Sequence, residues 1–240
     1  GLGDVYKRQD LRYAENFSIE EFESYRIVTV RNPWRGSGET LFQYTLVPVG
    51  AELPELSADA RIIRTPVKRL AVLGTVYLAH VEALDLYQEL IGVAHARYAS
   101  DRKTLQQLKN GYTKSIPGEG SIDIEVVLSL QPDLILASAV GDPQHDAHPL
   151  LERTGQSVAV TAGYMEKHPL GRAEWLKYTA AFFGKDAMAK ALFDEIEDRY
   201  EKLSALTEWI EYRPTVLANA PFAGAWHVPG GKSFTARAID

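Results

Sequence analysis

The 240-residue sequence predicts an α/β protein: a Rossmann-like lobe built on a parallel sheet, preceded by a β-hairpin and followed by a long helix. Three observations support this prediction. Short apolar segments with strand character alternate with helical segments between residues 67 and 168, which is typical of a parallel sheet with helices on its faces. Two β-rich segments precede this region. A helix-compatible stretch with one glycine break follows it.

The first part of the chain predicts an N-terminal β-hairpin extension over residues 10–66. Arg26–Arg31 and Leu41–Val47 are rich in β-branched and aromatic residues. The intervening NPWRGSGET contains loop formers, so we expect a hairpin with a long tip. A third short strand is expected at Arg61–Arg64. Residues 1–9, GLGDVYKRQ, do not have the pattern of a signal peptide, and we expect them to be a non-native leader outside the fold.

The alternating region predicts an N-terminal α/β lobe over residues 67–168. Its four strands are expected at Arg69–Leu73, Ile91–His95, Leu134–Ala137 and Ser157–Thr161. Helical segments between and around them are expected at Val76–Tyr87, Leu105–Lys109, the stretch before Pro132, and His148–Thr154.

Gly120–Ser138, GSIDIEVVLSLQPDLILAS, is the most informative segment. Ser121 is a suitable N-cap residue, and Pro132 ends the helix before an apolar strand. At 100° per residue the apolar side chains form one wide face, and Glu125 and Ser129 share the narrow polar remainder. We therefore expect Glu125 to be exposed on an otherwise buried helix.

A helix pair is predicted over residues 169–210, with a break at Gly184 that suits a helix C-cap. The second helix spans roughly 22 residues and about 33 Å. The remaining residues, 211–240, carry one expected strand at Pro214–Ala220 and the start of a helix. A piece of this size cannot bury a core of its own.

Composition excludes several classes of protein. The net charge is −6 and no basic run occurs, which argues against nucleic-acid binding. No apolar stretch approaches 18 residues, so no spanning helix is expected. Zero cysteines exclude disulfides, thiolate zinc sites and cysteine nucleophiles. No G-x-G-x-x-G follows the first strand of the lobe and no G-x-S-x-G occurs, so an enzyme on a Rossmann-like lobe is the least favoured alternative, and we expect no cofactor.

The segment Gly120–Ser138 closely resembles the signature of the metal-chelate class of ABC-importer substrate-binding proteins, which receive iron-siderophores, haem or cobalamin. LIGV at residues 90–93, PLGRAEW at 169–175 and AWHVPGGKSF at 225–234 are further similarities. In that family a glutamate at the position of Glu125 meets an arginine of the membrane permease. The alternative for this residue is an acid that only complements the helix dipole.

The resemblance implies two lobes joined by the long helix. Residues 211–240 are then the incomplete start of a C-terminal α/β lobe, and the sequence is expected to be truncated. It also implies an extracytoplasmic binding protein, periplasmic or anchored as a lipoprotein, whose partners are a metal chelate, an ABC permease and its ATPase subunits. We expect a monomer.

Ligands of open parallel sheets collect beyond the carboxyl ends of the strands, so the loops that follow the strands supply the candidate ligand residues. Phenol, imidazole, carboxylate and guanidinium groups suit a metal or an anionic chelate. The candidates in these loops are Tyr77, Arg97, Tyr98, Tyr164, Glu166 and His168. Those expected from the second lobe are Trp226, His227 and Lys232.

Each candidate also has a structural alternative, such as a rim tyrosine with a satisfied hydroxyl. A free-metal protein, binding zinc or manganese through His168, Glu166 and His227, is the main functional alternative. His145 and His148, with nearby carboxylates, are interpreted as part of a polar loop leading into a helix. Glu174 and Trp175 are assigned local structural roles.

Overall fold

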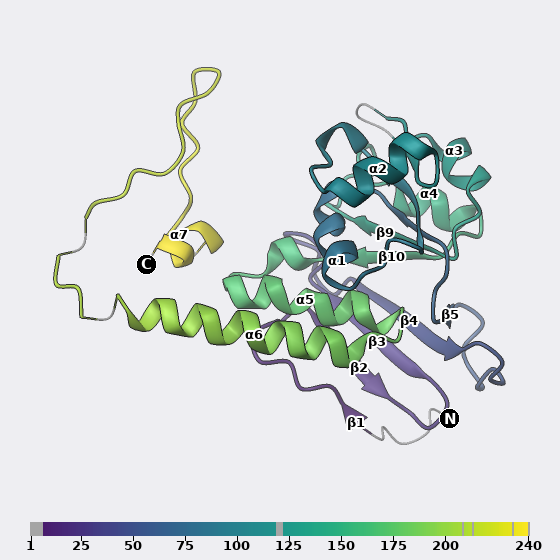
Figure 1. Ribbon diagram of the computed structural model, residues 1–240. Coiled ribbons are helices and arrows are strands. Elements are labelled where there is room, and N and C mark those ends of the chain that lie inside the picture. Colours follow the sequence, from purple (N-terminus) through teal and green to yellow (C-terminus); the bar gives the residue numbers. More distant parts are fainter. Residues whose placement is uncertain (1–6, 119–121, 208, 213, 232, 240) are drawn as a thin grey trace.

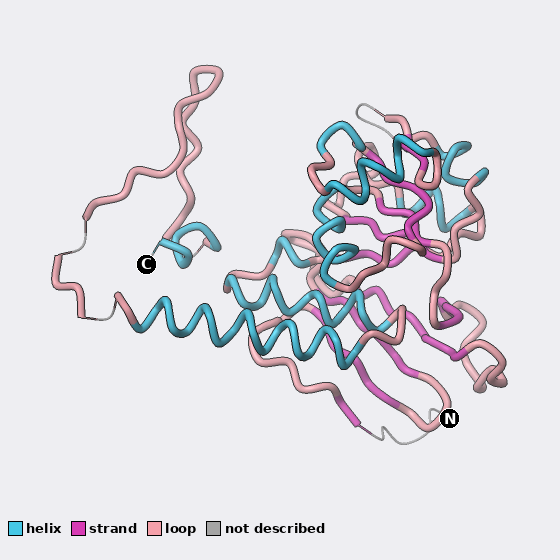
Figure 2. The backbone as a smooth tube through the Cα atoms, viewed as in Figure 1, coloured by secondary structure: helices cyan, strands magenta, loops and turns pink. Residues whose placement is uncertain are grey.

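The computed structural model describes residues 7–118, 122–207, 209–212, 214–231 and 233–239. Figure 1 shows a lobe with a parallel sheet, a second sheet built from the N-terminal strands, and two long helices packed against them. The second of these helices extends past the body of the protein to a separate C-terminal stretch (Figures 1 and 2). The α/β prediction is confirmed.

The N-terminal sheet has five strands rather than a hairpin and one extra strand. In spatial order they are β1 (Lys7–Arg8), β2 (Phe17–Glu21), β3 (Arg26–Arg31), β4 (Leu41–Pro48) and β5 (Arg61–Thr65). The predicted hairpin is β3–β4, and β5 runs parallel to β4. The expectation that residues 1–9 lie outside the fold is wrong for residues 7–9, because β1 pairs with β2 and the Gln9 N–H donates to the Ile19 carbonyl.

The lobe is built on a five-stranded sheet in which every pair is parallel. Its strands are β6 (Leu70–Val72), β7 (Leu90–Ala94), β8 (Lys114–Ile116), β9 (Leu134–Ser138) and β10 (Val158–Thr161), in the order β10-β9-β6-β7-β8. Four of these strands were predicted. The fifth, β8, has only three residues, two of them polar, and so lacks a strand signal of its own.

The helices of the lobe differ in length from the prediction: α2 is longer than expected, and the other three are shorter. They are α1 (Leu78–Ala83), α2 (Arg102–Asn110), α3 (Ile124–Ser129) and α4 (His148–Arg153). The expected helix at Val76–Tyr87 begins instead with a 3₁₀ turn at Thr75–Tyr77 and ends before Asp85, which has a left-handed φ of 49°. The N-cap of α3 is Asp123, whose carboxylate accepts the Val126 N–H at 3.1 Å, whereas Ser121 lies outside the described residues.

The predicted helix pair is confirmed as α5 (Pro169–Ala181) and α6 (Asp186–Ala205). Gly184, at a φ of +65°, makes the turn between them, a conformation that favours glycine. The 20 residues of α6 correspond to about 30 Å. Beyond it, the described residues of the predicted strand Pro214–Ala220 form no strand. A short helix, α7 (Phe234–Ile239), follows.

One core joins the two sheets. Helix α5 is buried over most of its length, and its aromatic side chains pack with residues of both sheets. Trp175 and Tyr178 contact Phe17 of β2, with ring centroids 4.8 and 5.7 Å away. The N-terminal sheet is therefore part of the same folded unit as the lobe. In the described part of the chain, no helix has both the length and the apolar character needed to cross a membrane.

Candidate ligand site

Four exposed hydrophobic or aromatic side chains mark the loops at the carboxyl ends of the parallel strands. Val76 follows β6 and is 72% exposed, and Tyr98 follows β7 and is 63% exposed. Val140 follows β9 and is 55% exposed, and Tyr164 follows β10 and is 43% exposed. Because the carboxyl ends of parallel strands share one edge of the sheet, these side chains belong to the same edge. We call these four residues the apolar collar.

Arg97 and Tyr98 place a cation on this edge. The Arg97 Nη2 donates to the Tyr98 hydroxyl at 3.0 Å, and the guanidinium carbon lies 4.8 Å from the centre of the Tyr98 ring. Both side chains are exposed. This position agrees with the predicted ligand role of the pair, which remains a prediction.

Tyr164 also stays on the rim. Its hydroxyl lies 2.9 Å from the Ala139 carbonyl oxygen and 3.1 Å from that of Pro33. It therefore ties the loop after β10 to the loop after β9 and to the tip of the β3–β4 hairpin. The residue remains 43% exposed and can make another contact.

Tyr77 does not reach the edge, which corrects its prediction as a ligand. The 3₁₀ turn after β6 directs its ring into the core, where the hydroxyl lies 2.8 Å from the Thr161 hydroxyl. Burial raises the pKa of Tyr77 to about 12, against the opposing effect of its hydroxyl partners. Its neighbour Val76, which the sequence reasoning missed, takes the exposed position in this loop.

Glu166 is also a structural residue rather than a ligand. Its buried carboxylate accepts the backbone N–H groups of Glu15 and Asn16 at 3.0–3.2 Å. The indole N–H of Trp175 donates to the same carboxylate at 3.1 Å. A carboxylate with these donors has little capacity left for a metal, so the candidate role of Glu166 is corrected.

His168 lies on the side of α5 that meets α6. Its Nδ1 accepts the Leu170 N–H at 3.1 Å and so caps α5. The ring stacks on Tyr13 at 5.0 Å and meets Tyr200 of α6 at 5.6 Å. Burial, with a smaller effect of Arg237, lowers the pKa of His168. Because Nδ1 accepts the hydrogen bond from Leu170, the proton of the neutral ring is on Nε2 and no nitrogen lone pair is left for a metal, so the predicted ligand role of His168 is corrected.

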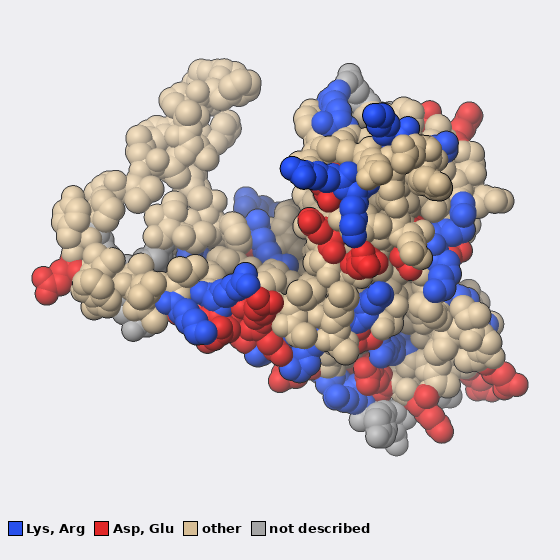
Figure 3. Space-filling view, viewed as in Figure 1, with Lys and Arg blue, Asp and Glu red and all other residues tan. Residues whose placement is uncertain are grey.

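Two of the second-lobe candidates, Trp226 and His227, lie on the C-terminal stretch, and their hydrogen bonds to described residues are local. The Trp226 indole N–H donates to the Ala218 carbonyl at 3.2 Å, and Asn219 Nδ2 donates to the His227 carbonyl at 2.8 Å. Lys232 lies outside the described residues. Figure 3 shows this stretch almost without charged side chains on the face drawn, whereas α6 carries many.

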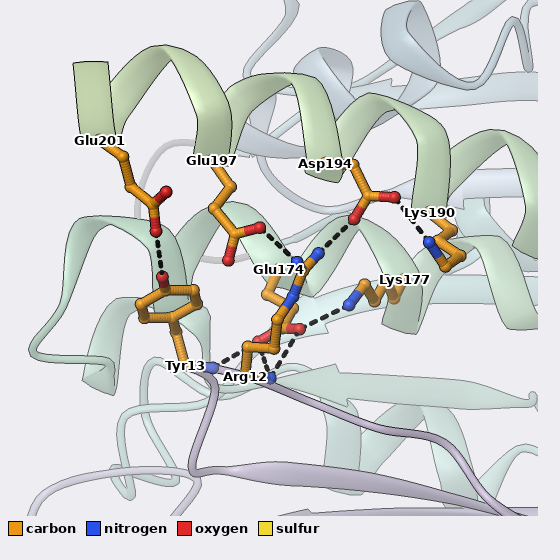
Figure 4. Close-up of polar contacts among 8 residues, drawn as sticks. All are labelled: Arg12, Tyr13, Glu174, Lys177, Lys190, Asp194, Glu197 and Glu201. Carbon is orange, nitrogen blue, oxygen red and sulfur yellow. Dashed lines mark hydrogen bonds and ion pairs between the residues drawn. The ribbon is translucent and has the colours of Figure 1, made fainter. Parts of the chain in front are cut away.

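Glu174 and Trp175 have structural roles, as predicted, but several of their partners lie in the N-terminal segment and are not local. Glu174 accepts the N–H groups of Arg12, Tyr13 and Ala14 at 2.8–3.1 Å and pairs with Lys177 at 2.6 Å. Burial alone raises the pKa of Glu174, but Lys177 and the backbone donors outweigh it, and the net shift is downward. Figure 4 shows the Arg12 side chain continuing outward to Asp194 and Glu197 of α6.

The hairpin tip of the N-terminal sheet reaches the same edge as the collar. Gly141, in the loop after β9, has a φ of +80°, and a side chain added there would collide with the indole of Trp34. Trp34 in turn lies near Phe42 and the buried His148. The N-terminal extension therefore supports a loop of the candidate site, which the sequence did not predict.

A cavity of about 260 Å³ opens beside the collar, and it contains a histidine that the sequence reasoning missed. Its lining residues are Leu73, His95, Ile122, Ala137, Ser138, His145 and Ala147. His145 Nδ1 lies 2.7 Å from Asp142 Oδ2. His95, a lone histidine in a loop, gave no pattern that would have singled it out.

The polar-loop interpretation of residues 142–148 agrees with the other contacts. Asp146 accepts the N–H groups of Val140 and Gly141 at 2.8 and 2.9 Å. His148 is buried, with its ring 5.3 Å from that of Phe42. Within the described ranges, no group of three or more His, Asp and Glu side chains is placed to hold a metal ion.

A larger groove of about 1420 Å³ lies elsewhere, between the β2–β3 turn and the α5–α6 turn. Phe22 and Tyr25, whose rings stack at 4.6 Å, line it together with Phe183. None of the collar residues borders this groove. We place the candidate site at the carboxyl edge of the parallel sheet because the loops that carry the polar and exposed aromatic residues lie there.

Glu125 is exposed on the first turn of α3, as predicted. It forms no hydrogen bond or ion pair with any residue that the structure describes. Helix α3 packs closely on β7, since a side chain at Gly92 would meet Leu130 at 2.6 Å. The close packing explains the glycine of the LIGV segment and fixes the helix that presents Glu125.

Comparison with known proteins supports the architecture. Two uncharacterized lipoproteins of Methanocaldococcus jannaschii are 27% and 24% identical over 221 and 198 residues, covering 86% and 77% of this chain and 52% and 46% of theirs. The chain thus spans about half the length of these relatives.

Solved structures with a similar fold include a periplasmic binding protein from Veillonella parvula, with a TM-score of 0.52 and 13% identity, covering 75% of this chain and 53% of that one. Helicobacter pylori CeuE, in a nickel–histidine complex, gives a TM-score of 0.51 with 17% identity over 70% of this chain and 48% of its own. The family model described as periplasmic binding protein matches residues 70–240. The chain therefore belongs to the periplasmic binding protein family, as the sequence resemblance implied.

Proposed function

We propose that this chain is the extracytoplasmic substrate-binding component of an ABC importer, and that it captures a metal chelate such as an iron-siderophore, haem or a cobalamin-type corrinoid. The chelate rests on the collar and is covered by a second lobe, to which α6 leads. Trp226, His227 and Lys232 approach it from that side. The loaded protein then delivers the chelate to a membrane permease driven by ATPase subunits.

The observation that carries this proposal is the apolar collar. Each of four loops at the carboxyl edge exposes one large hydrophobic or aromatic side chain. Single exposed apolar residues are ordinary, but several of them on loops at one edge of a sheet indicate a binding surface. A chelate with aromatic or macrocyclic parts gains burial on such a surface, and the tyrosine rings offer flat faces for stacking.

Arg97 supports a ligand with negative charge. Its guanidinium is held beside the collar by the Tyr98 ring and hydroxyl. A planar guanidinium can pair with carboxylate, propionate or catecholate oxygens in a bidentate manner. The collar and Arg97 together therefore suit an apolar, anionic chelate better than a small polar solute.

The free-metal alternative is less well supported. Two of its three expected ligands, Glu166 and His168, are engaged in structural contacts. A protein that binds a bare zinc or manganese ion needs three or four converging side chains. A chelate brings its own donor atoms and needs fewer from the protein.

Two further features fit an importer component. Glu125 is exposed and unpaired among the described residues, as a docking residue for a permease arginine requires. The relatives from Methanocaldococcus jannaschii are named as lipoproteins, which supports a location at the outer face of a membrane. We propose that the protein acts as a monomer there.

Calorimetric titration tests the proposal. Ferric catecholate, ferric hydroxamate, haem and cyanocobalamin are titrated into this chain and into the complete protein, with the metal-free chelators as controls. We expect saturable one-to-one binding of one chelate class at about micromolar affinity or tighter. No saturable binding of any of the four to either form would overturn the proposal.

A further inference from the structure

Two imidazoles line the small cavity at the carboxyl edge of the parallel sheet. His95 comes from the end of β7 and His145 from the loop before α4, and both line the same hollow of about 260 Å³. Leu73, Ala137 and Ala147 form its apolar walls. Sequence positions 50 residues apart are thus brought together at the edge of the sheet where the ligand is proposed to lie.

The contact with Asp142 fixes the tautomer of His145. A carboxylate can only accept a hydrogen bond, so the 2.7 Å contact between His145 Nδ1 and Asp142 Oδ2 places the proton on Nδ1. The Nε2 lone pair is then free. A carboxylate that fixes the tautomer in this way is the usual outer partner of a metal-binding histidine.

The His95 ring is available as well. Its backbone has a left-handed φ of 55°, a region that histidine adopts more often than most residues other than glycine. Its ring makes no hydrogen bond to any residue in the described part of the chain. A partly buried imidazole with no hydrogen-bond partner among the described residues therefore lines the cavity.

We propose that His95 and His145 bind directly to the metal of a chelate that leaves two coordination positions open. Imidazole suits nickel, copper, iron and zinc ions. Two side chains are too few for a bare ion, so the chelator supplies the remaining donors. Asp142 acts as a positioning residue. This inference rests on the proposed function for the nature of its natural ligand, but the site itself can be tested separately.

The probe is nickel–nitrilotriacetate, a four-donor chelate that leaves two positions on nickel. It is titrated by calorimetry into the protein produced without a histidine tag. Nickel–EDTA, in which the chelator fills the coordination sphere, is the ligand control. We expect one equivalent of the first complex to bind and the second to give no saturable heat.

Variants locate the site. His95→Ala and His145→Ala are expected to weaken nickel–nitrilotriacetate binding by at least about tenfold, and Asp142→Asn by about tenfold. Gln144→Ala, an exposed change in the same loop, leaves it unchanged. In the wild-type protein, paramagnetic nickel broadens the ring NMR signals of His95 and His145 selectively, a readout that needs no variant. The inference would be overturned if nickel–nitrilotriacetate did not bind or if it still bound after both histidine changes. It would also be overturned if the nickel broadened NMR signals of other residues and not those of His95 and His145.

The outcomes separate this inference from the proposed function. If a ferric chelate with a full coordination sphere binds and nickel–nitrilotriacetate does not, the histidine site is wrong and the importer function stands. If nickel–nitrilotriacetate binds through both histidines but no natural chelate class binds, the site stands and the proposed function falls.

Discussion

The hydroxyl groups of Tyr44 and Tyr178 bracket one residue of an edge strand. The Tyr44 oxygen accepts the Val160 N–H at 2.7 Å, and the Tyr178 hydroxyl donates to the Val160 carbonyl at 2.8 Å. Val160 lies in β10, the edge of the parallel sheet, so its outward backbone groups have no neighbouring strand. Tyrosines from β4 and α5 satisfy them and join the N-terminal sheet to the lobe.

Removing either hydroxyl should destabilise the fold. Tyr44→Phe leaves a buried N–H unpaired and Tyr178→Phe leaves a buried carbonyl unpaired, and each is expected to lower the free energy of unfolding by about 1–3 kcal/mol. Urea unfolding measures the change. Tyr112→Phe, at a tyrosine 77% exposed, is the control and should have no effect. Equal stability of all three variants and the wild type would show that the hydrogen bonds of Tyr44 and Tyr178 to Val160 do not stabilise the fold.

The carboxylates of Glu174 and Glu166 accept hydrogen bonds from successive backbone N–H groups of the N-terminal segment. Glu174→Gln should increase hydrogen exchange at the amides of Arg12–Ala14, and Glu166→Gln should do so at Glu15 and Asn16, because each loses a charged acceptor. Amide-resolved exchange measures both, and each variant serves as the control for the other. A uniform increase over the whole chain would mean global destabilisation instead.

The free energy of unfolding is expected to depend on pH because of His80. Burial lowers its pKa to about 4, whereas an unfolded histidine titrates near 6.5. Between these values the unfolded chain binds a proton that the folded chain does not, so stability falls as the pH drops from about 6.5 to about 4, by up to about 1.4 kcal/mol per pH unit. Above that window this histidine has no effect.

The test is urea unfolding at several pH values. His80→Gln, which keeps a polar group near the Thr179 hydroxyl 2.7 Å from Nδ1, should flatten the slope between pH 4 and 6.5. An unchanged slope in the variant would assign the pH dependence to other groups.

Glu125 is expected to act in docking and not in ligand binding. Glu125→Ala should leave the affinity for the chelate unchanged and reduce uptake by a reconstituted importer, because the exposed acid on α3 belongs neither to the collar nor to the lining of the small cavity. Glu52→Ala, an exposed acid in the loop before β5, is the matched control. Equal losses of affinity and uptake would show a structural role for Glu125.

Local patterns predicted most of the fold. The alternation of apolar strands with helices identified four strands of the parallel sheet, and Gly184 located the turn between α5 and α6. Strands β2 and β8 were missed because they are short and partly polar. The helix predicted to continue to Tyr87 stops early because Asp85 adopts a left-handed conformation, which no local pattern indicated.

The candidate site was less predictable than the fold. The loops were identified correctly because parallel strands share a carboxyl edge, yet which side chain points outward in each loop depends on tertiary packing. Tyr77 turns inward while Val76 is exposed. Glu166 and His168 have partners about 150 residues earlier, in the N-terminal segment, and this distance in sequence hid their structural roles.

The most direct test of the collar as the ligand site is the affinity of one bound chelate for a collar variant. Val76→Ser with Val140→Ser should weaken binding by about tenfold or more, because two exposed apolar contacts are lost. Val49→Ser, at a valine 70% exposed on the N-terminal sheet, should bind like the wild type. Unchanged affinity in the double collar variant, with the fold intact by circular dichroism, would contradict the placement of the ligand at this edge.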